Sequence, residues 1–138
     1  MHPTRAQYLP LMKALLDEGY DVCADLCGVD YLAFSGRSLP DGVTAERFEI
    51  VVNLLDITRK QRLRVRVQVP ADEPVVPSLF DLWPGTEAME REAFDMFGVS
   101  FDDHPDLTRI LMPEDWIGYP LRKDYDDARI PVQFKGTR

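Results

Sequence analysis

The spacing of apolar residues predicts a helix near the start of the chain. Tyr8 and the apolar residues after it recur every three or four positions through Leu16, which is the spacing of one helix face. We therefore expect a helix from Tyr8 to Glu18, with Pro10 in its first turn, where a missing N–H group costs least. Gly19 is expected to end it.

A second helix is predicted from Glu87 to Phe97, with Thr86 as its N-cap and Gly98 after its last turn. An ion pair between Glu87 and Arg91, four positions apart, would add about 0.2–0.5 kcal/mol. The apolar stripe of this helix consists of Met89, Ala93, Met96 and Phe97. The charged residues of its other face are Glu87, Glu90, Arg91, Glu92 and Asp95.

Three segments have the composition or alternation of strands. Tyr20–Phe34 predicts one or two short strands with a break near Gly28, and Phe48–Leu55 predicts a well-buried strand. Arg62–Val69 alternates, with its valines inward and its three arginines outward, so one sheet face is expected to be basic. The short connection between the last two segments predicts an antiparallel hairpin.

The rest of the chain is expected to be irregular. Residues 70–84 contain four prolines and allow a short helical turn at Ser78–Leu82, and Asp102–Asp127 combines dense turn residues with weak periodicity. These elements predict an α+β fold. One two-layer domain, residues 1–125, would pack its helices on a small mixed or antiparallel sheet, with an irregular C-terminal segment and an extended tail at 126–138.

The charged residues are unevenly distributed along the chain, and residues 81–127 are strongly acidic. The net charge is −8, and residues 81–127 hold 13 acidic residues against four basic ones, so we do not expect nucleic acid as a partner. No apolar run reaches the roughly 18 residues of a membrane span, and the first residues lack the layout of a signal peptide. With two cysteines only, Cys23 and Cys27, a reducing setting and buried core thiols are favoured over a metal site.

Two other clusters of ionisable residues are candidates for chemistry. The run from Asp102 to Asp106 has oxygen ligands but lacks the pattern of a calcium loop, so a turn is the favoured interpretation. Glu90 and Glu92 with Asp95 allow three interpretations: a carboxylate pair for acid–base work, a solvated helix face, or a face that pairs with arginines of another protein.

Four short sequence motifs lie in order within 36 residues of the chain. They read EREAFDMFGV from Glu90, HPDLTRIL from His104, PEDWIG from Pro113 and PLRKDY from Pro120. This set closely resembles the signature of one family from proton-pumping NADH–quinone oxidoreductase, the 30 kDa-type (C) subunit of respiratory complex I. Weaker similarity extends upstream over essentially the whole chain.

The resemblance implies a non-catalytic structural subunit of the peripheral arm, with no catalytic, cofactor or metal residues of its own. NADH, FMN, iron–sulfur clusters and quinone would belong to other subunits. The chain would brace the quinone-reducing module on the cytoplasmic side of the bacterial inner membrane, contacting the membrane only through the complex. Its partners would be chiefly the 49 kDa-type quinone-site subunit and the iron–sulfur subunits B and I.

The resemblance also implies a set of residues that orient the irregular segment and contact partners. These are Glu90, Arg91, Glu92, Asp95, Gly98, His104, Arg109, Trp116, Arg122, Lys123, Asp124 and Tyr125.

Two alternatives stay open. The same kind of protein could serve a related machine, such as a membrane-bound hydrogenase, a formate hydrogenlyase, or a dehydrogenase driven by a reduced deazaflavin or by ferredoxin. A small metal-dependent enzyme that uses Asp102, Asp103, His104 and Asp106 is the alternative from another class.

Overall fold

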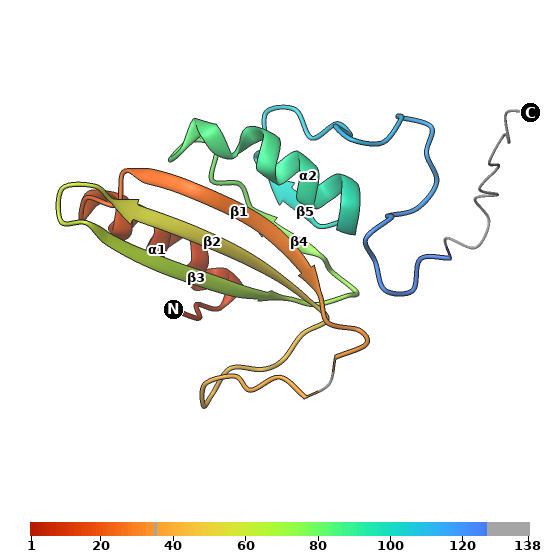
Figure 1. Ribbon diagram of the computed structural model, residues 1–138, viewed down its shortest axis with the longest axis horizontal. Coiled ribbons are helices and arrows are strands. Elements are labelled where there is room, and N and C mark those ends of the chain that lie inside the picture. Colours follow the sequence, from red (N-terminus) through yellow and green to blue (C-terminus); the bar gives the residue numbers. More distant parts are fainter. Residues whose placement is uncertain (35, 127–138) are drawn as a thin grey trace, which may run out of the picture.

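The computed structural model describes residues 1–34 and 36–126, and a three-stranded antiparallel sheet forms its centre (Figure 1). The strands are β1 (Val22–Asp30), β2 (Phe48–Asp56) and β3 (Gln61–Val69), in the order β1-β2-β3. Phe48 pairs with Val69 and Asp56 with Gln61, which confirms the predicted hairpin. The alternation predicted for β3 is also confirmed, since Val65, Val67 and Val69 are buried.

The predicted break in the first strand is wrong. β1 runs through Gly28 without interruption, and its only irregularity in register lies between Cys23 and Asp25. Gly28 has a packing role instead, because a Cβ atom there would lie 2.8 Å from Cδ2 of Phe97. The glycine lets the second helix approach the sheet closely, which a sequence pattern cannot distinguish from a break.

Helix α1 (Arg5–Asp17) begins three residues earlier than predicted. Thr4 is its N-cap and forms a capping box with Gln7, which satisfies backbone N–H groups at the helix start. The earlier start places Pro10 inside the helix rather than in its first turn, so that prediction is wrong. Gly19 follows the helix with a φ of 103°, as expected of a residue that ends it.

Helix α2 (Glu87–Phe97) has the predicted bounds, but Thr86 does not cap it. Thr86 has helical dihedral angles and ends a short 3-10 helix, η1 (Pro84–Thr86), that continues directly into α2. Its buried side chain therefore makes no cap hydrogen bond. Gly98 takes the left-handed conformation (φ 71°) at the helix end and donates its N–H to the carbonyl of Phe94, as predicted.

Both helices lie on the same face of the sheet, and the core fills the space between these layers. A second, two-stranded parallel sheet joins β4 (Val75–Pro77) to β5 (Ser100–Asp102) beside α2, so the range 70–84 is not wholly irregular. The core contains Tyr8, Met12, Leu15, Phe48, Ile50, Val52, Leu54, Val65, Val67, Leu79 and Ala93. This α+β arrangement agrees with the predicted fold class. No helix in the two described ranges is long and apolar enough to cross a membrane.

Candidate interaction segment

The residues after β5 include most of those that the sequence analysis singled out. Residues 103–126, which we call the C-terminal segment, form no helix or strand. The segment passes α2 and then reaches the region beside the end of β1 (Figure 1). Such an irregular path needs hydrogen-bond partners for its backbone, and side chains of the domain supply them.

Asp95 on α2 is the first of these partners, and it is fully buried. Its Oδ2 accepts the backbone N–H groups of Ile110, Leu111 and Met112 at 3.1, 2.7 and 2.8 Å. Its Oδ1 accepts Nη1 of Arg109 at 2.6 Å. Burial alone would raise the pKa of this carboxyl, but these hydrogen bonds outweigh burial and hold the pKa below its usual value.

We call a buried carboxylate that binds the backbone of the segment an anchor. Two arginines add further hydrogen bonds to the anchor formed by Asp95. Arg109 also donates from Nη2 to the carbonyl of Gly118 at 2.9 Å, so one side chain connects α2 to two turns of the segment. Arg91 donates to the carbonyls of Thr108 and Arg109 at 3.0 and 3.1 Å. It also forms the predicted ion pair with Glu87 at 3.0 Å. The helix face therefore does pair with arginines, but with arginines of the same chain.

A second anchor lies at the end of β1, where Asp30 is buried. Its carboxylate accepts both Nε and Nη2 of Arg47, at 3.1 and 2.9 Å, and the backbone N–H of Lys123 at 2.9 Å. Arg47 donates in addition to Asp124, so it links the strand to the far end of the segment. Opposing burial, the hydrogen bonds from Arg47 and Lys123 keep the pKa of Asp30 below its usual value.

The stretch around Arg122 packs against the end of α2. Arg122 donates from Nε to the carbonyl of Phe97 at 2.6 Å, and its guanidinium lies over the rings of Phe48 and Tyr119. A Cβ atom on Gly98 would come within 2.6 Å of Tyr119 and of Arg122. Gly98 is therefore required both for its positive φ and for the space that this packing occupies.

Glu90 is also fully buried, but it holds the chain before α2 rather than the backbone of the C-terminal segment. Its carboxylate accepts the hydroxyl of Ser78 at 2.6 Å and the N–H of Leu79 at 2.7 Å, and Nε2 of the buried His104 lies 3.9 Å away. Burial, only partly offset by these contacts, raises the pKa of Glu90. Because the Ser78 hydroxyl donates to Glu90 rather than to His104, the three residues do not form a nucleophilic triad.

Burial corrects one interpretation of the helix face. Glu90 and Asp95 are fully buried, so the solvated-face interpretation is wrong for them, whereas Glu92 is exposed. Of the remaining signature residues, Trp116 is half-buried, and its indole N–H has no hydrogen-bond partner among the described residues. Tyr125 packs its ring toward Gly118.

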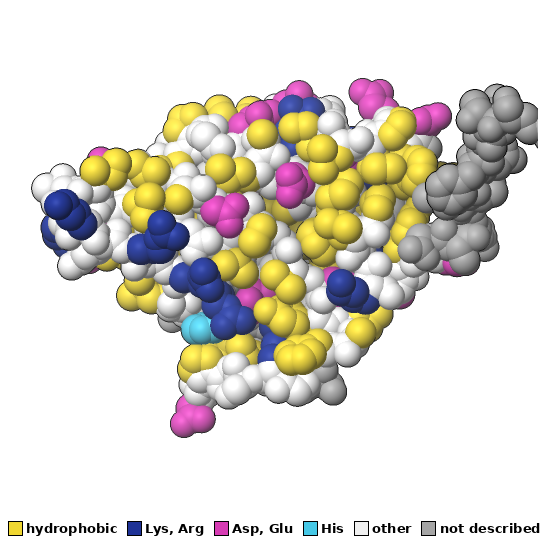
Figure 2. Space-filling model, viewed as in Figure 1, with side chains coloured by type: hydrophobic (Ala, Val, Ile, Leu, Met, Phe, Trp, Pro, Cys, Tyr) yellow, Lys and Arg dark blue, Asp and Glu magenta, His cyan; other side chains and the backbone are white. Residues whose placement is uncertain are grey.

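Arg109 and Arg122 of the segment point inward, and large apolar residues are left outside among exposed carboxylates such as Glu114. Ile110, Leu111, Ile117 and Leu121 are exposed by 40, 60, 90 and 50%. Figure 2 shows apolar side chains gathered over α2 and the segment. Exposed apolar groups on a segment whose backbone is held by side chains of the same chain are typical of a surface that another protein covers.

Other candidate chemistry gains no support from the structure. Cys23 and Cys27 are half-buried rather than fully buried, and burial raises the pKa of the Cys23 thiol to about 11. Across residues 1–34 and 36–126, no three His, Cys, Asp or Glu side chains are grouped so that they could hold a metal ion. Asp102, Asp103 and Asp106 are exposed around a turn in which His104 Nδ1 accepts the Asp106 N–H at 3.1 Å.

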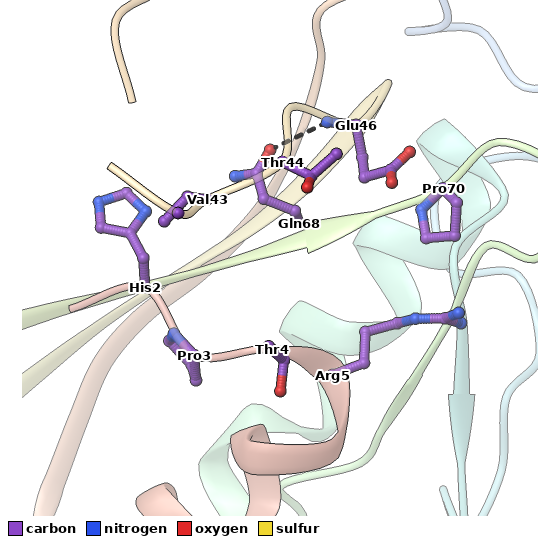
Figure 3. A pocket seen from close by; sticks show the side chains of 10 residues that line it. His2, Pro3, Thr4, Arg5, Val43, Thr44, Glu46, Gln68 and Pro70 are labelled. Atoms are coloured by element: carbon purple, nitrogen blue, oxygen red, sulfur yellow. Dashed lines mark hydrogen bonds between the residues drawn. The ribbon is translucent and has the colours of Figure 1, made fainter. Parts of the chain in front are cut away.

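A cavity of about 210 Å³ lies between the N-terminus, the 42–46 loop and the end of β3 (Figure 3). Part of its polar lining is already engaged. Arg5 pairs with Glu73 at 2.9 Å, and the side-chain oxygen Oε1 of Gln68 accepts the N–H of Glu46 at 3.3 Å and Nη2 of Arg37 at 2.8 Å. Nδ1 of the lining residue His2 is buried with no hydrogen-bond partner among the described residues.

Comparison with known proteins agrees with this arrangement. The family model of the 30 kDa subunit of respiratory-chain NADH dehydrogenase matches residues 1–129. The chain belongs to this family. The C subunit of NADH-quinone oxidoreductase from Saccharopolyspora erythraea is 42% identical over 136 residues, covering 96% of this chain and 51% of the relative. Its counterpart from Bordetella pertussis is 49% identical over 111 residues, covering 77% and 54%.

One solved structure supports the same family, and a second shares the fold. A trypsin-resistant fragment of Nqo5 superposes with a TM-score of 0.68 at 34% identity, covering 77% of this chain and 80% of the fragment. A chain of an archaeal membrane-bound sulfane sulfur reductase superposes with a TM-score of 0.69 over 91% of this chain and 70% of that chain. At 21% identity, the second likeness shows the fold alone. The chain spans about half the length of the curated relatives it matches.

Asp30 and Arg47 are site residues that the sequence analysis missed. Asp30 ends an apolar strand and Arg47 precedes the next one. In the sequence, each therefore looks like an ordinary residue at a strand end. Only the antiparallel pairing of β1 with β2 brings them together and opposite Lys123.

Proposed function

We propose that this chain is a structural subunit of the peripheral arm of proton-pumping NADH:quinone oxidoreductase. In this proposal it braces the quinone-reducing module and carries out no redox step itself. NADH, FMN, iron–sulfur clusters and quinone are bound by other subunits. The chain lies on the cytoplasmic side of the bacterial inner membrane and reaches the membrane only through the complex.

One observation supports the bracing role most directly. Asp95, Arg109 and Asp30 satisfy the backbone of the C-terminal segment from within the chain, and this leaves the apolar side chains around Ile117 exposed. A segment that is already ordered loses little conformational entropy when it binds. We propose that it docks on the 49 kDa-type quinone-site subunit, with the iron–sulfur subunits B and I as further neighbours.

A related respiratory complex is the second candidate. The fold shared with the sulfane sulfur reductase chain is compatible with it, and the subunits that copurify would distinguish the two.

Copurification of the tagged chain from solubilised membranes tests the proposal. We expect the wild-type chain to recover the 49 kDa-type subunit and an Ile117→Asp variant to recover at least about tenfold less, because a charge would replace an exposed apolar anchor. Ile57→Asp is the matched control, since Ile57 is exposed on the hairpin turn, away from the segment. Recovery of no complex I subunit by the wild-type chain would contradict the proposal.

A further inference from the structure

The sheet has a second face that neither helix covers. Both helices pack on the side that carries Val52 and Val67, while the opposite side chains of all three strands face outward. Figure 2 views this open face, with the row of Lys and Arg side chains along β3 and apolar side chains over β1 and β2. We call it the open face.

The open face carries two apolar pairs, and the polar pair of Asp25 and Asn53 lies between them. Cys27 pairs with Val51 and Val22 with Leu55 across β1 and β2, and all four residues are half-buried. Val29, also half-buried, lies next to Cys27 on the same face. A sheet face that remains in water normally carries polar residues at such positions. These apolar pairs are therefore better suited to contact with another surface than to solvent.

The apolar pairs are bordered by arginines on β3. In the part of the chain that the structure describes, the guanidinium of Arg62 has no hydrogen-bond or ion-pair partner, and the residue is exposed. Arg64 is also exposed and donates from Nε to the neutral Asn53 at 2.9 Å. The positive charge of both residues is thus available to a partner, although the chain as a whole has a net charge of −8.

One end of the open face is held rigid by the buried Glu49. Its carboxylate accepts Nε of Arg66 at 2.7 Å and Nη1 of Arg37 at 3.3 Å, and the Arg37 guanidinium lies 3.8 Å from the Tyr31 ring centroid. The Tyr31 ring in turn contacts Phe34, which is exposed. Ordered Tyr, Phe and Arg side chains are the types enriched at protein interfaces.

We propose that the open face binds a second protein surface, apolar where it meets the Cys27–Val51 and Val22–Leu55 pairs and acidic where it meets Arg62 and Arg64. The proposal rests on the proposed function, because it takes this protein to be another subunit of the same complex. The open face and the C-terminal segment lie on different parts of the molecule (Figure 1). With one subunit bound at the open face and another at the C-terminal segment, the chain connects two neighbouring subunits, as a bracing role requires.

The test reverses the free charges with the double substitution R62E/R64E in the tagged chain and measures copurifying subunits. We expect about tenfold less recovery of one subunit, because an acidic surface would then face two carboxylates. We also expect the wild-type contact to weaken as salt rises from about 0.1 M to about 1 M. Lys13→Glu is the control, since Lys13 is exposed on α1, on the other side of the sheet.

A second measurement does not depend on the fold of the double variant. A photo-crosslinking residue, p-benzoylphenylalanine, replaces Leu55 on the open face or Lys13 as the control, in the assembled complex. We expect a crosslink to an acidic region of another subunit from position 55 and none from position 13.

Three outcomes would overturn the proposed contact at the open face, and a fourth would overturn the proposed function as well. Normal recovery with R62E/R64E, an absent crosslink from position 55, or a crosslink to a second copy of this chain would each show that the open face is not this contact. In those cases the wild-type chain still recovers subunits and Ile117→Asp does not, so the proposed function stands. If the wild-type chain recovers no subunit, the proposed function fails as well.

Discussion

Arg109 donates to Asp95 at 2.6 Å across 14 positions of sequence, and the same carboxylate accepts three successive backbone N–H groups of the C-terminal segment. A single buried side chain on α2 thus replaces the regular hydrogen bonding that the segment lacks. The negative charge at this position keeps the segment in one conformation, while Leu111 and Ile117 remain exposed on its outer side.

Removing the Asp95 carboxylate should release the segment. We expect Asp95→Ala to lower the free energy of unfolding by about 3 kcal/mol, since it leaves Arg109 and three backbone N–H groups without their acceptor. Denaturant titration gives the free energy, and limited proteolysis between residues 107 and 118 reports the segment directly. Glu92→Ala, an exposed change on the same helix, should shift neither. Equal protease resistance in Asp95→Ala and wild type would refute this role.

Gly98 should not tolerate a side chain. Gly98→Ala combines a positive φ with a Cβ atom 2.5 Å from Cε2 of Tyr119, and we expect a loss of at least about 1–2 kcal/mol. Gly85→Ala is the matched control, because no atom lies within 4 Å of a Cβ there. Thermal unfolding of both variants is the measurement. Similar midpoints for the two would mean that Tyr119 and Arg122 do not pack as described.

Gly28 and Phe97 should show coupled energetics. Gly28→Ala places a methyl group 2.8 Å from Phe97 and is expected to cost about 1–3 kcal/mol through overpacking. In the double variant with Phe97→Leu, the smaller side chain makes room, so the two losses should sum to more than the measured total. A double-mutant cycle in denaturant measures this coupling. Strict additivity would argue against the contact.

The anchors predict acid sensitivity. Asp30 and Asp95 have pKa values below the ordinary 3.8 in the folded chain, so the stability they contribute is present above pH 3.8 and is lost as pH falls through the lowered values. Unfolding free energy should therefore drop steeply between about pH 4 and pH 2. Asp95→Asn should flatten part of this slope in a pH series of denaturant titrations. An unchanged slope would show that Asp95 is not a source of it.

Much of the fold could be predicted because local pattern decides it. The alternation of Arg62–Val69 follows from one buried sheet face, and the end of α2 follows from Gly98. Thr86 shows the limit of this reasoning. A threonine before a helical pattern is ordinarily an N-cap, but here the chain enters α2 through η1, so the residue is already helical.

The site was harder to predict because its partners are distant in sequence. Periodicity places Glu90 and Asp95 on the polar face of α2, and pattern alone assigns such a face to solvent. The structure instead covers that face with Ser78 and with the backbone at residues 110–112. The charge of the two residues is satisfied inside the chain, and no local signal in the sequence reports this.

Hydroxyl-radical footprinting of Ile117 and Leu111 shows whether a partner covers the C-terminal segment in the complex. It compares side-chain oxidation in the isolated chain with oxidation in the assembled complex, using exposed Ile57 on the hairpin turn as the internal reference. We expect strong protection of both side chains on assembly and ordinary reactivity in the isolated chain. Equal oxidation of Ile117 and Leu111 in the two states would show that no partner covers the segment and would contradict the account.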